Sequence, residues 1–209
     1  MAHMAAQPVS GLPFTTTQFA DDGEASGTER AASWLMQYAA VMAPLHADRP
    51  TSVVFDIDDT LIQQNGMVIL PMQRAFVLLK KMGVQVHVVT ARPDRGQNRA
   101  LTVAQMKANG LGDYDSIELA PPSERTARGI TAFKERCRQQ IARTTRLLAT
   151  VGDSAWDLTA QPTALQAFQR LQPEGTYLCV PPGSAAVALK LQSRPRHRGP
   201  LRPQMSTLG

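Results

Sequence analysis

The sequence predicts an α/β fold with a doubly wound, Rossmann-like parallel sheet, and three observations support this prediction. Short apolar runs rich in β-branched residues, such as residues 53–57 and 84–89, are typical of strands buried on both faces of a sheet. These runs alternate with segments of helical periodicity, which is the pattern of a parallel sheet covered by helices. Acidic and polar residues directly follow several runs, at the edge of such a sheet where ligands bind.

The first expected element is a helix over residues 28–46. Large apolar side chains recur there at helical spacing and would pack on the body of the protein: Trp34, Tyr38, Met42 and Leu45. Pro50 follows shortly after the helix. Residues 1–27 show little periodicity, so we expect them to form a flexible arm.

Strands and helices alternate from residue 53 onwards. Pro71 lies in the first turn of one predicted helix and Gly83 follows its end, while Gly110 closes the next helix. The third helix of this series is long and basic. The predicted order is strand 53–57, helix 71–82, strand 84–89, helix 97–109, a weaker strand 116–119, helix 126–144, and strands 147–151 and 176–180. Residues 28–189 are therefore expected to form one domain.

The composition is that of an ordinary globular protein, with 43% hydrophobic and 19% charged residues. No apolar run approaches the roughly 18 residues that a membrane crossing needs. The start of the chain lacks the basic and apolar segments of a secretory signal, so a cytoplasmic location is expected. Two cysteines are too few for a disulfide scaffold.

The net charge of +5 is concentrated in residues 190–209, because the remaining residues carry 17 bases and 17 acids. A basic tail of this kind can contact nucleic acid. It can equally be a solvated, disordered end, which its three prolines favour. Both interpretations stay open, as does the formation of a homo-oligomer.

Three carboxylates crowd the end of the first buried strand, in the run Asp56-Ile57-Asp58-Asp59. Such crowding costs electrostatic free energy, although acidic residues at a strand end can also form turns and helix caps. An Asp-x-Asp pair can divide two tasks, since one carboxylate attacks phosphorus and the other transfers the proton. Both can also face a hard cation through oxygen. The spacing therefore favours a functional site.

Two further strand ends carry groups that suit a phosphate. Thr90 and Arg92 follow the second strand, where a hydroxyl and a guanidinium can bind phosphoryl oxygens. For Arg92, a surface ion pair with Asp94 is an equally good interpretation. After the fourth strand, Gly152 allows a close turn, and Asp153 would complete the oxygen ligands of a magnesium ion, with Asp157 one turn later.

These motifs resemble those of the haloacid dehalogenase (HAD) superfamily. The run from Asp56 to Leu61 is similar to the family's first motif, Asp-x-Asp-x-Thr-Leu, and Thr90 is similar to the second. Gly152-Asp153 with Asp157 resembles the fourth. The third motif is a lysine, for which Lys107 and Lys134 are available, and Lys134 lies where the family usually places it, on the helix before the fourth-motif strand.

The resemblance implies a mechanism and a cofactor. Asp56 would be the nucleophile that forms an aspartyl phosphate, and Asp58 the acid and base. Mg²⁺ would be held by a carboxylate oxygen of Asp56, the backbone carbonyl of Asp58, and Asp153, with Asp157 in direct or water-mediated contact. The phosphoryl oxygens would be bound by Thr90, Arg92 and Lys134. An acid at Asp58 favours phosphate esters over haloacids as substrates.

Within the superfamily, the chain looks most like the acid-phosphatase branch of class B and class C type. The features that carry this likeness are Thr90-Ala91-Arg92 followed by Thr102, Phe133-Lys134 followed by Arg138, and a helical segment before the first motif. Neither interval between the motifs is long enough for a full cap domain. The site is therefore expected to be open, or covered by the N-terminal helix or a partner chain.

Three functions follow from this resemblance. The first is a phosphomonoesterase that acts on small organic phosphates such as nucleotides. The second is a phosphatase of nucleic-acid ends or another macromolecule, with the basic tail of residues 190–209 as its electrostatic contact. The third is a binding protein that has kept the fold without catalysis, which the complete motif set disfavours.

Overall fold

The computed structural model describes residues 15–21, 25–171, 175–180 and 185–192, and it contains the predicted α/β fold. Its centre is a seven-stranded sheet in the order β1-β6-β7-β5-β2-β3-β4. The strands are β1 Thr15–Phe19, β2 Thr51–Phe55, β3 Gln85–Pro93, β4 Ser116–Ala120, β5 Arg146–Gly152, β6 Thr176–Val180 and β7 Val187–Lys190. The helices are α1 Gly27–Leu45, α2 Leu70–Lys81, α3 Asn98–Ala108, α4 Ala127–Thr144, the short 3₁₀ turn η1 Ala155–Asp157, and α5 Pro162–Arg170.

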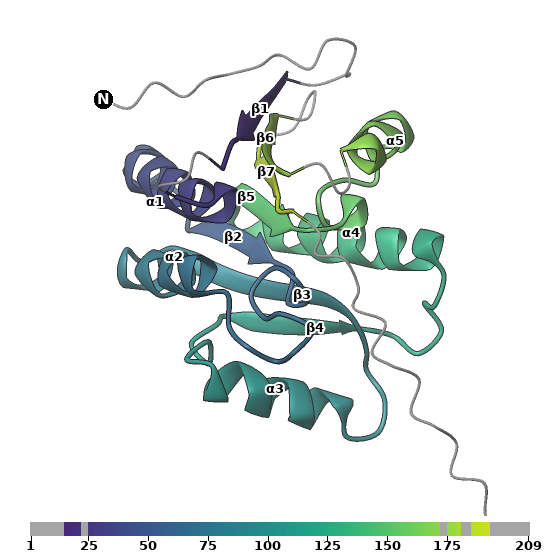
Figure 1. The fold of residues 1–209 in the computed structure, drawn as a ribbon. Coiled ribbons are helices and arrows are strands. Elements are labelled where there is room, and N and C mark those ends of the chain that lie inside the picture. Colours follow the sequence, from purple (N-terminus) through teal and green to yellow (C-terminus); the bar gives the residue numbers. More distant parts are fainter. Residues whose placement is uncertain (1–14, 22–24, 172–174, 181–184, 193–209) are drawn as a thin grey trace, which may run out of the picture.

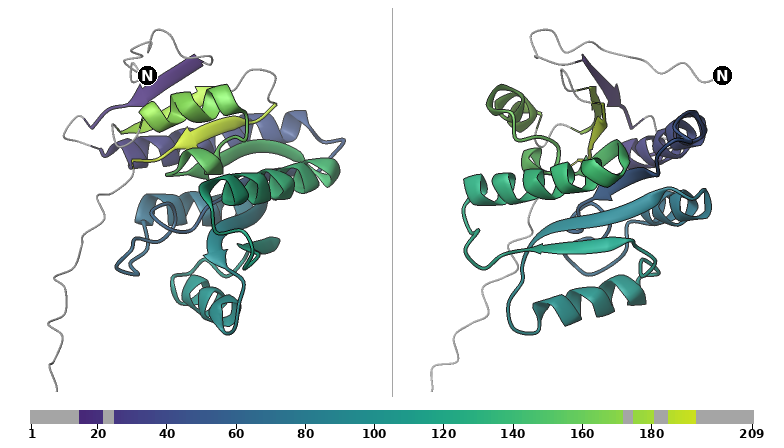
Figure 2. Two further views of the ribbon diagram at one scale, coloured as in Figure 1. Left: turned by 90° about the vertical axis from the view of Figure 1, so that its right-hand side faces the viewer. Right: turned by 180° about the vertical axis from the view of Figure 1, so that it is seen from behind.

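Helices cover both faces of the sheet, as a doubly wound fold requires (Figures 1 and 2). α1 and α2 pack together on one face, α4 lies on the other, and α3 lies beyond the outer strand β4 (Figure 1). All five residues of β2 are buried, because this strand lies between β3 and β5 and beneath helices on both sides. Burial on both faces explains why residues 53–55 of β2 form a continuous apolar run rather than an alternating one.

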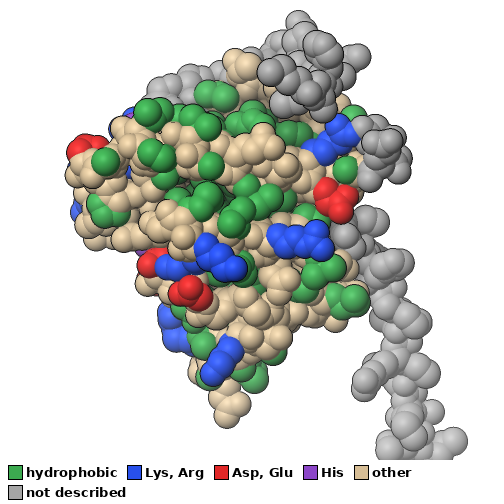
Figure 3. Space-filling view, turned by 90° about the vertical axis from the view of Figure 1, so that its left-hand side faces the viewer, with side chains coloured by type: hydrophobic (Ala, Val, Ile, Leu, Met, Phe, Trp, Pro, Cys, Tyr) green, Lys and Arg blue, Asp and Glu red, His purple; other side chains and the backbone are tan. Residues whose placement is uncertain are grey.

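The helix α1 covers nearly the residues predicted for it, 28–46, and packs on the body of the protein as expected. Ser26 accepts a hydrogen bond from the Glu29 backbone amide at 3.1 Å, and the Glu29 side chain returns the contact to Ser26, which closes a capping box. Leu35 and Ala39 are fully buried against the α2 side of the sheet. Hydrophobic side chains are scattered over the side of the molecule on which α1 and α2 lie (Figure 3). The exposed large apolar residues of these two helices are Val41, Leu45, Leu70 and Leu78.

One edge of the sheet differs from the all-parallel prediction. β6 pairs antiparallel with β7, and β1 pairs antiparallel with β6, whereas β7, β5, β2, β3 and β4 run parallel. The connection over residues 181–186 is too short for the crossover of a dozen or more residues that parallel neighbours need, so β6 and β7 form a hairpin.

Both predicted ends of the domain need correction. Residues 15–19, expected in a flexible arm over 1–27, form β1 and pair with β6 from Thr15↔Val180 to Phe19↔Thr176. Lys190, counted in the basic tail over 190–209, is fully buried in β7 and donates to the carbonyl oxygens of Gly175 and Leu191. The other basic residues of that tail lie outside the described residues.

Among the described residues, no helix combines the length and the apolar character that a membrane crossing requires.

Candidate active site

The first acidic run lies at the carboxyl end of β2, in the middle of the sheet. The structure ends β2 at Phe55, so Asp56 is the first residue beyond the strand. Its backbone amide donates to the Val151 carbonyl oxygen of neighbouring β5 at 3.0 Å. The Ile57 carbonyl oxygen then accepts from the amides of Leu61 and Ile62, which turns the chain back sharply. This turn fixes Asp56 over the sheet and leaves the Asp58 side chain 47% exposed.

The second acidic run follows β5, the strand next to β2. Ser154 and Asp157 form a reciprocal capping box across η1, in which the Ser154 amide donates to Asp157 Oδ2 at 2.9 Å. Asp157 is folded back onto Gly152, where an added Cβ would collide with its Cβ and its carboxylate. Glycine is therefore required at 152 because Asp157 occupies the space of a side chain, while the backbone there is not in the left-handed region.

We expect Gly152→Ala to lower by about 100-fold the phosphatase activity that the sequence motifs predict, because the methyl group must displace Asp157 from its position. Phosphate release under saturating Mg²⁺ measures the effect. Gly112→Ala is the matched control, since a Cβ there meets Lys107 only at ordinary contact distances of 3.5–3.6 Å. Wild-type activity in Gly152→Ala would show that the reaction does not need Asp157 in this position.

These two loops bring three carboxylates together. Oxygen atoms of Asp56, Asp153 and Asp157 all lie within 4.8 Å of one another, although Asp56 is far from the other two in the sequence. Lys134 reaches them from α4, donating to Asp56 Oδ1 at 2.6 Å and to Asp157 Oδ1. The Lys134 side chain is 2% exposed, and its two partners Asp56 and Asp157 are also buried, whereas Asp153 is partly buried.

Burial controls the protonation of this network. It raises the pKa of Asp56 well above its usual value, against the opposing effect of Lys134, and the charges of Asp157 and Asp153 raise it further. Burial, then Asp157 and Asp59, raise the pKa of Asp153 to about 7. Burial alone would lower the pKa of Lys134, but its two carboxylate partners outweigh burial and raise it. The ammonium group therefore stays charged.

The donor set fits a hard divalent cation. Fully ionised, the three acids and Lys134 leave two negative charges in a buried place, which is costly without a counter-charge. Carboxylate oxygens in a small cluster are the ligands that Mg²⁺ prefers. Asp59 Oδ1, in the same loop, is a buried oxygen without a hydrogen-bond partner among the described residues. The acidic group can thus hold a metal ion, and its elevated carboxylate pKa values are those of the metal-free protein.

Arg92 faces Asp58 rather than Asp94. Its Nη2 and Nε atoms donate to Asp58 Oδ1 at 2.6 Å and Oδ2 at 3.0 Å, and its Nη1 donates to Gln105 Oε1 at 2.7 Å. Asp94 pairs with Arg99 at 2.6 Å instead, so the predicted alternative of an Arg92–Asp94 ion pair was wrong. Sequence reasoning missed Gln105, because only the fold brings α3 beside Arg92.

Thr90 lies in β3, which pairs with β2, the strand that precedes Asp56. Phe55 is in register with Val88, so Thr90 is level with the loop just beyond β2. Thr90 is fully buried, and its Oγ1 accepts from the Arg92 amide at 3.3 Å. The carboxyl ends of three adjacent strands thus carry Asp56, Thr90 and Asp153, as the sequence predicts for this edge. Lys107, the lysine that sequence reasoning set aside, is exposed on α3.

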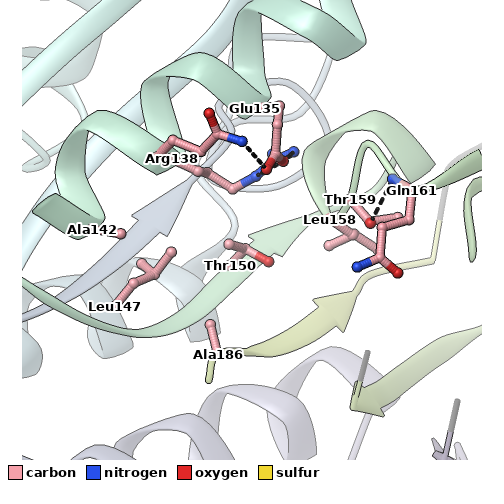
Figure 4. Close-up of a pocket in the computed structure, with 10 residues that line it drawn as sticks. Glu135, Arg138, Ala142, Leu147, Thr150, Leu158, Thr159, Gln161 and Ala186 are labelled. Carbon is pink, nitrogen blue, oxygen red and sulfur yellow. Dashed lines mark hydrogen bonds and ion pairs between the residues drawn. The ribbon is translucent and has the colours of Figure 1, made fainter. Parts of the chain in front are cut away.

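Arg138, on α4, binds the backbone of η1. Its Nη1 donates to the carbonyl oxygens of Trp156 at 3.2 Å and Asp157 at 2.8 Å, and Glu135 pairs with its Nη2 at 2.8 Å. A cavity of about 170 Å³ opens beside this pair, between α4 and the segment with Thr159 and Gln161 (Figure 4). None of the three clustered acids lines it, so Arg138 supports the position of Asp157 rather than binding phosphate.

The second cavity is also remote from the acids. It measures about 820 Å³ and is lined by the end of α1, the start of β2 at Thr51 and the start of β3 at Gln85, which is the amino-end edge of these strands. α1 itself packs on α2 and on the sheet face. In the described residues, therefore, no inserted cap domain stands between the motifs, and α1 does not act as one.

Comparison with known proteins agrees with this geometry. A family model for the HAD superfamily, subfamily IIIB (acid phosphatase), matches residues 70–177, more than half of the chain. The match includes Thr90, Lys134, Asp153 and Asp157, and it begins after the first acidic run. No curated protein sequence matches the chain significantly.

Solved structures show the same fold. The class C acid phosphatase from Bacillus anthracis is 13% identical with a TM-score of 0.58, covering 72% of this chain and 73% of that chain. The tungstate-bound structure of the class C acid phosphatase from Bacillus anthracis is 13% identical with a TM-score of 0.50, covering 73% and 74%. At this identity the likeness establishes the fold, and the family match adds the class of enzyme. The chain belongs to the HAD superfamily, subfamily IIIB, and is a phosphatase of the acid phosphatase family.

Proposed function

We propose that this phosphatase is a Mg²⁺-dependent phosphomonoesterase that acts on small organic phosphates, nucleotides among them, through an aspartyl phosphate on Asp56. The observation that carries the proposal is the difference in surroundings between two aspartates of one loop. Asp56 is buried against Lys134 in the acidic cluster, whereas Asp58, two residues later, is half exposed and paired with Arg92. One carboxylate is thus fixed beside the Lys134 ammonium group, and the other is partly exposed to solvent.

In the first half of the reaction, a carboxylate oxygen of Asp56 attacks the phosphorus atom. The bond between phosphorus and the leaving oxygen breaks, and Asp58 donates its proton to that oxygen. Lys134 and Thr90 would donate hydrogen bonds to the phosphoryl oxygens, whose charge must be neutralised during transfer.

In the second half, Asp58 takes a proton from water, and the water oxygen attacks phosphorus and releases Asp56 as a carboxylate. Mg²⁺ held by Asp56, the Asp58 carbonyl oxygen, Asp153 and Asp157 would supply positive charge for the phosphoryl oxygens. Lys134 keeps Asp56 oriented throughout, because the ammonium group also contacts Asp157 and cannot turn away without losing both partners.

The Arg92–Asp58 pair has a direct consequence for substrate binding. A phosphoryl group competes with Asp58 for the same guanidinium, since both present two oxygens in matching geometry. Binding of substrate therefore draws Arg92 away from Asp58 and frees this carboxyl group for proton transfer. Gln105, bound to the third nitrogen of Arg92, keeps the guanidinium at the site during the exchange.

We expect Arg92→Lys to lower kcat/KM by roughly 10- to 100-fold, mainly through KM, because a lysine cannot make the paired contacts of the guanidinium. Steady-state kinetics on p-nitrophenyl phosphate measure the change. Arg95→Lys, on the exposed loop after β3, serves as the control. An unchanged KM in Arg92→Lys would remove Arg92 from substrate binding.

The decisive experiment for the proposed function is phosphate release from p-nitrophenyl phosphate with Mg²⁺ and after its chelation. We expect turnover with Mg²⁺ that disappears with chelator and returns when Mg²⁺ is restored. Equal turnover after complete chelation would contradict the metal dependence. No turnover at all by folded, Mg²⁺-loaded protein would contradict a general phosphomonoesterase and favour a demanding macromolecular substrate or a silent binding role.

The nucleic-acid alternative has no comparable support. Its expected contact was the basic tail, of which residues 193–209 lie outside the described residues, and Lys190 is buried in β7. Salt dependence distinguishes the two substrates, because binding of a polyanion weakens steeply with added salt. A small phosphomonoester should show only a shallow dependence.

A further inference from the structure

Asp59 has a backbone conformation that residues other than glycine rarely adopt. Its φ angle is 55°, and of the described residues it is the non-glycine residue with positive φ. This region of φ is unfavourable for an L-residue, although Asp and Asn tolerate it better than most. A glycine would fit the turn without this cost, so the turn alone does not explain an aspartate here.

The carboxylate of Asp59 adds a second cost. Asp59 is 8% exposed, and its Oδ2 accepts a hydrogen bond from Gln64 Nε2 at 2.7 Å. Its Oδ1 is buried without a hydrogen-bond partner in the described part of the structure. A buried acceptor left unpaired destabilises the folded protein, and more so when it is charged. Native proteins rarely keep such an atom unless something outside the polypeptide satisfies it.

The position of Asp59 shows where that partner lies. Asp59 is three residues beyond Asp56, and its charge helps raise the pKa of Asp153, after burial and Asp157. It is therefore near the acidic cluster on the Asp153 side. Yet the three acids whose oxygens fall within 4.8 Å of one another do not include it. This placement suits an indirect contact with a bound ion rather than direct ligation.

We propose that Asp59 is a positioning residue for the metal, whose Oδ1 accepts a hydrogen bond from a water molecule on the divalent ion. The inference rests on the proposed function, since it requires an ion at Asp56, Asp153 and Asp157. Mg²⁺ keeps several of its waters in protein sites and has few protein ligands, so acceptors for those waters influence affinity and orientation. The contact satisfies the unpaired oxygen and explains the unfavourable backbone conformation.

A different role for Asp59 is to anchor the loop over residues 63–68 through Gln64. The two roles use different oxygens, which makes them separable. Gln64 is exposed, so Gln64→Ala lets solvent replace the contact to Oδ2 and leaves Oδ1 as it is. Asp59→Gly removes both oxygens and also the backbone strain, while Asp59→Asn keeps the shape and removes the charge.

The experiment is a calorimetric titration of Mg²⁺ into the full-length wild type and these three variants, with thermal unfolding of each metal-free protein. We expect Asp59→Gly to weaken Mg²⁺ binding by about 10- to 100-fold, which is the usual effect of losing a group that accepts a hydrogen bond from a metal ligand. The Tm of this variant without metal should equal or exceed that of the metal-free wild type, because glycine relieves the backbone strain. Asp59→Asn should weaken binding less, because an amide oxygen still accepts. Gln64→Ala should bind Mg²⁺ like the wild type.

Wild-type Mg²⁺ affinity in Asp59→Gly would overturn the inference and leave the proposed function intact. Weakening in Gln64→Ala equal to that in Asp59→Gly would also overturn it, in favour of the loop anchor. Asp153→Asn, which removes a direct ligand, should lose most of the binding and serves as the reference for a damaged site. A wild type that binds no Mg²⁺ would instead contradict the proposed function itself, so the two failures are distinguishable.

Discussion

Asp56→Asn is expected to abolish turnover, with kcat reduced by at least about 10⁴-fold, because an amide oxygen cannot replace the carboxylate as nucleophile. The same variant should be at least as stable as the wild type without metal. Burial raises the pKa of Asp56, so the folded protein disfavours its charged form, and removing that charge at neutral pH relieves a cost. Phosphate release and thermal unfolding in chelator measure the two effects.

The control for this variant is Asp113→Asn, at an aspartate whose side chain is 84% exposed. Mass spectrometry of each preparation verifies that the introduced amide has not hydrolysed back to the carboxylate. If a verified Asp56→Asn protein retained even a hundredth of wild-type turnover, another group would be the nucleophile. If it were strongly destabilised without metal, the burial cost assigned to this carboxylate would be wrong.

Lys134→Met is expected to damage both activity and stability. The substitution leaves Asp56 and Asp157 buried without the cation that both contact, and breaking a buried ion pair in this way costs about 3–5 kcal/mol. It also removes a positive charge from the phosphoryl site, which should reduce kcat by about 10²- to 10³-fold. Urea unfolding in chelator and steady-state kinetics with Mg²⁺ give the two values.

Lys107→Met is the matched control, because Lys107 is the other lysine between the second and fourth motifs and is exposed on α3. It should change neither quantity. Combining Lys134→Met with Asp157→Asn should restore part of the stability, since one unpaired charge is removed, but none of the activity. Stability loss in Lys134→Met of less than 1 kcal/mol would show that the buried network does not depend on this lysine.

Much of the fold could be predicted because its strongest signals are local. β2, β3 and β5 are buried on both faces, so their β-branched apolar runs are visible in the sequence itself. The order of strands and helices then leaves few topologies. The clustering of Asp56 with Asp153 follows from the same rule, because the carboxyl ends of adjacent parallel strands meet.

The missed elements depend on contacts between distant residues. β1 is a polar run over Thr15–Phe19 whose hydrogen bonds come from β6, at the other end of the chain. β7 has only four residues and obtains its place from β5 and β6. Neither segment has a strong periodicity of its own, so the sequence suggested an arm for the first and no element for the second, whose last residue, Lys190, was counted in the basic tail.

The contacts that site residues make with their neighbours could not be predicted from the sequence either. Gln105 contacts Arg92 only because the chain returns along α3, and the Asp58–Arg92 pair joins the loop after β2 to the end of β3, 34 residues later. The unpaired oxygen of Asp59 depends on the turn that buries it. Sequence motifs identify reactive groups by spacing, but they contain no information on which neighbours hold those groups.

Detection of the covalent intermediate tests the central claim most directly. Asp58→Asn should form the aspartyl phosphate from p-nitrophenyl phosphate, whose good leaving group needs little acid assistance, and should hydrolyse it slowly. Acid quenching during turnover, digestion and mass spectrometry then locate the phosphoryl group. The account predicts one phosphoryl group on the peptide that contains Asp56, absent from Asp56→Asn. A phosphoryl group on any other residue, or turnover of Asp58→Asn without a trapped intermediate under rapid quenching, would contradict it.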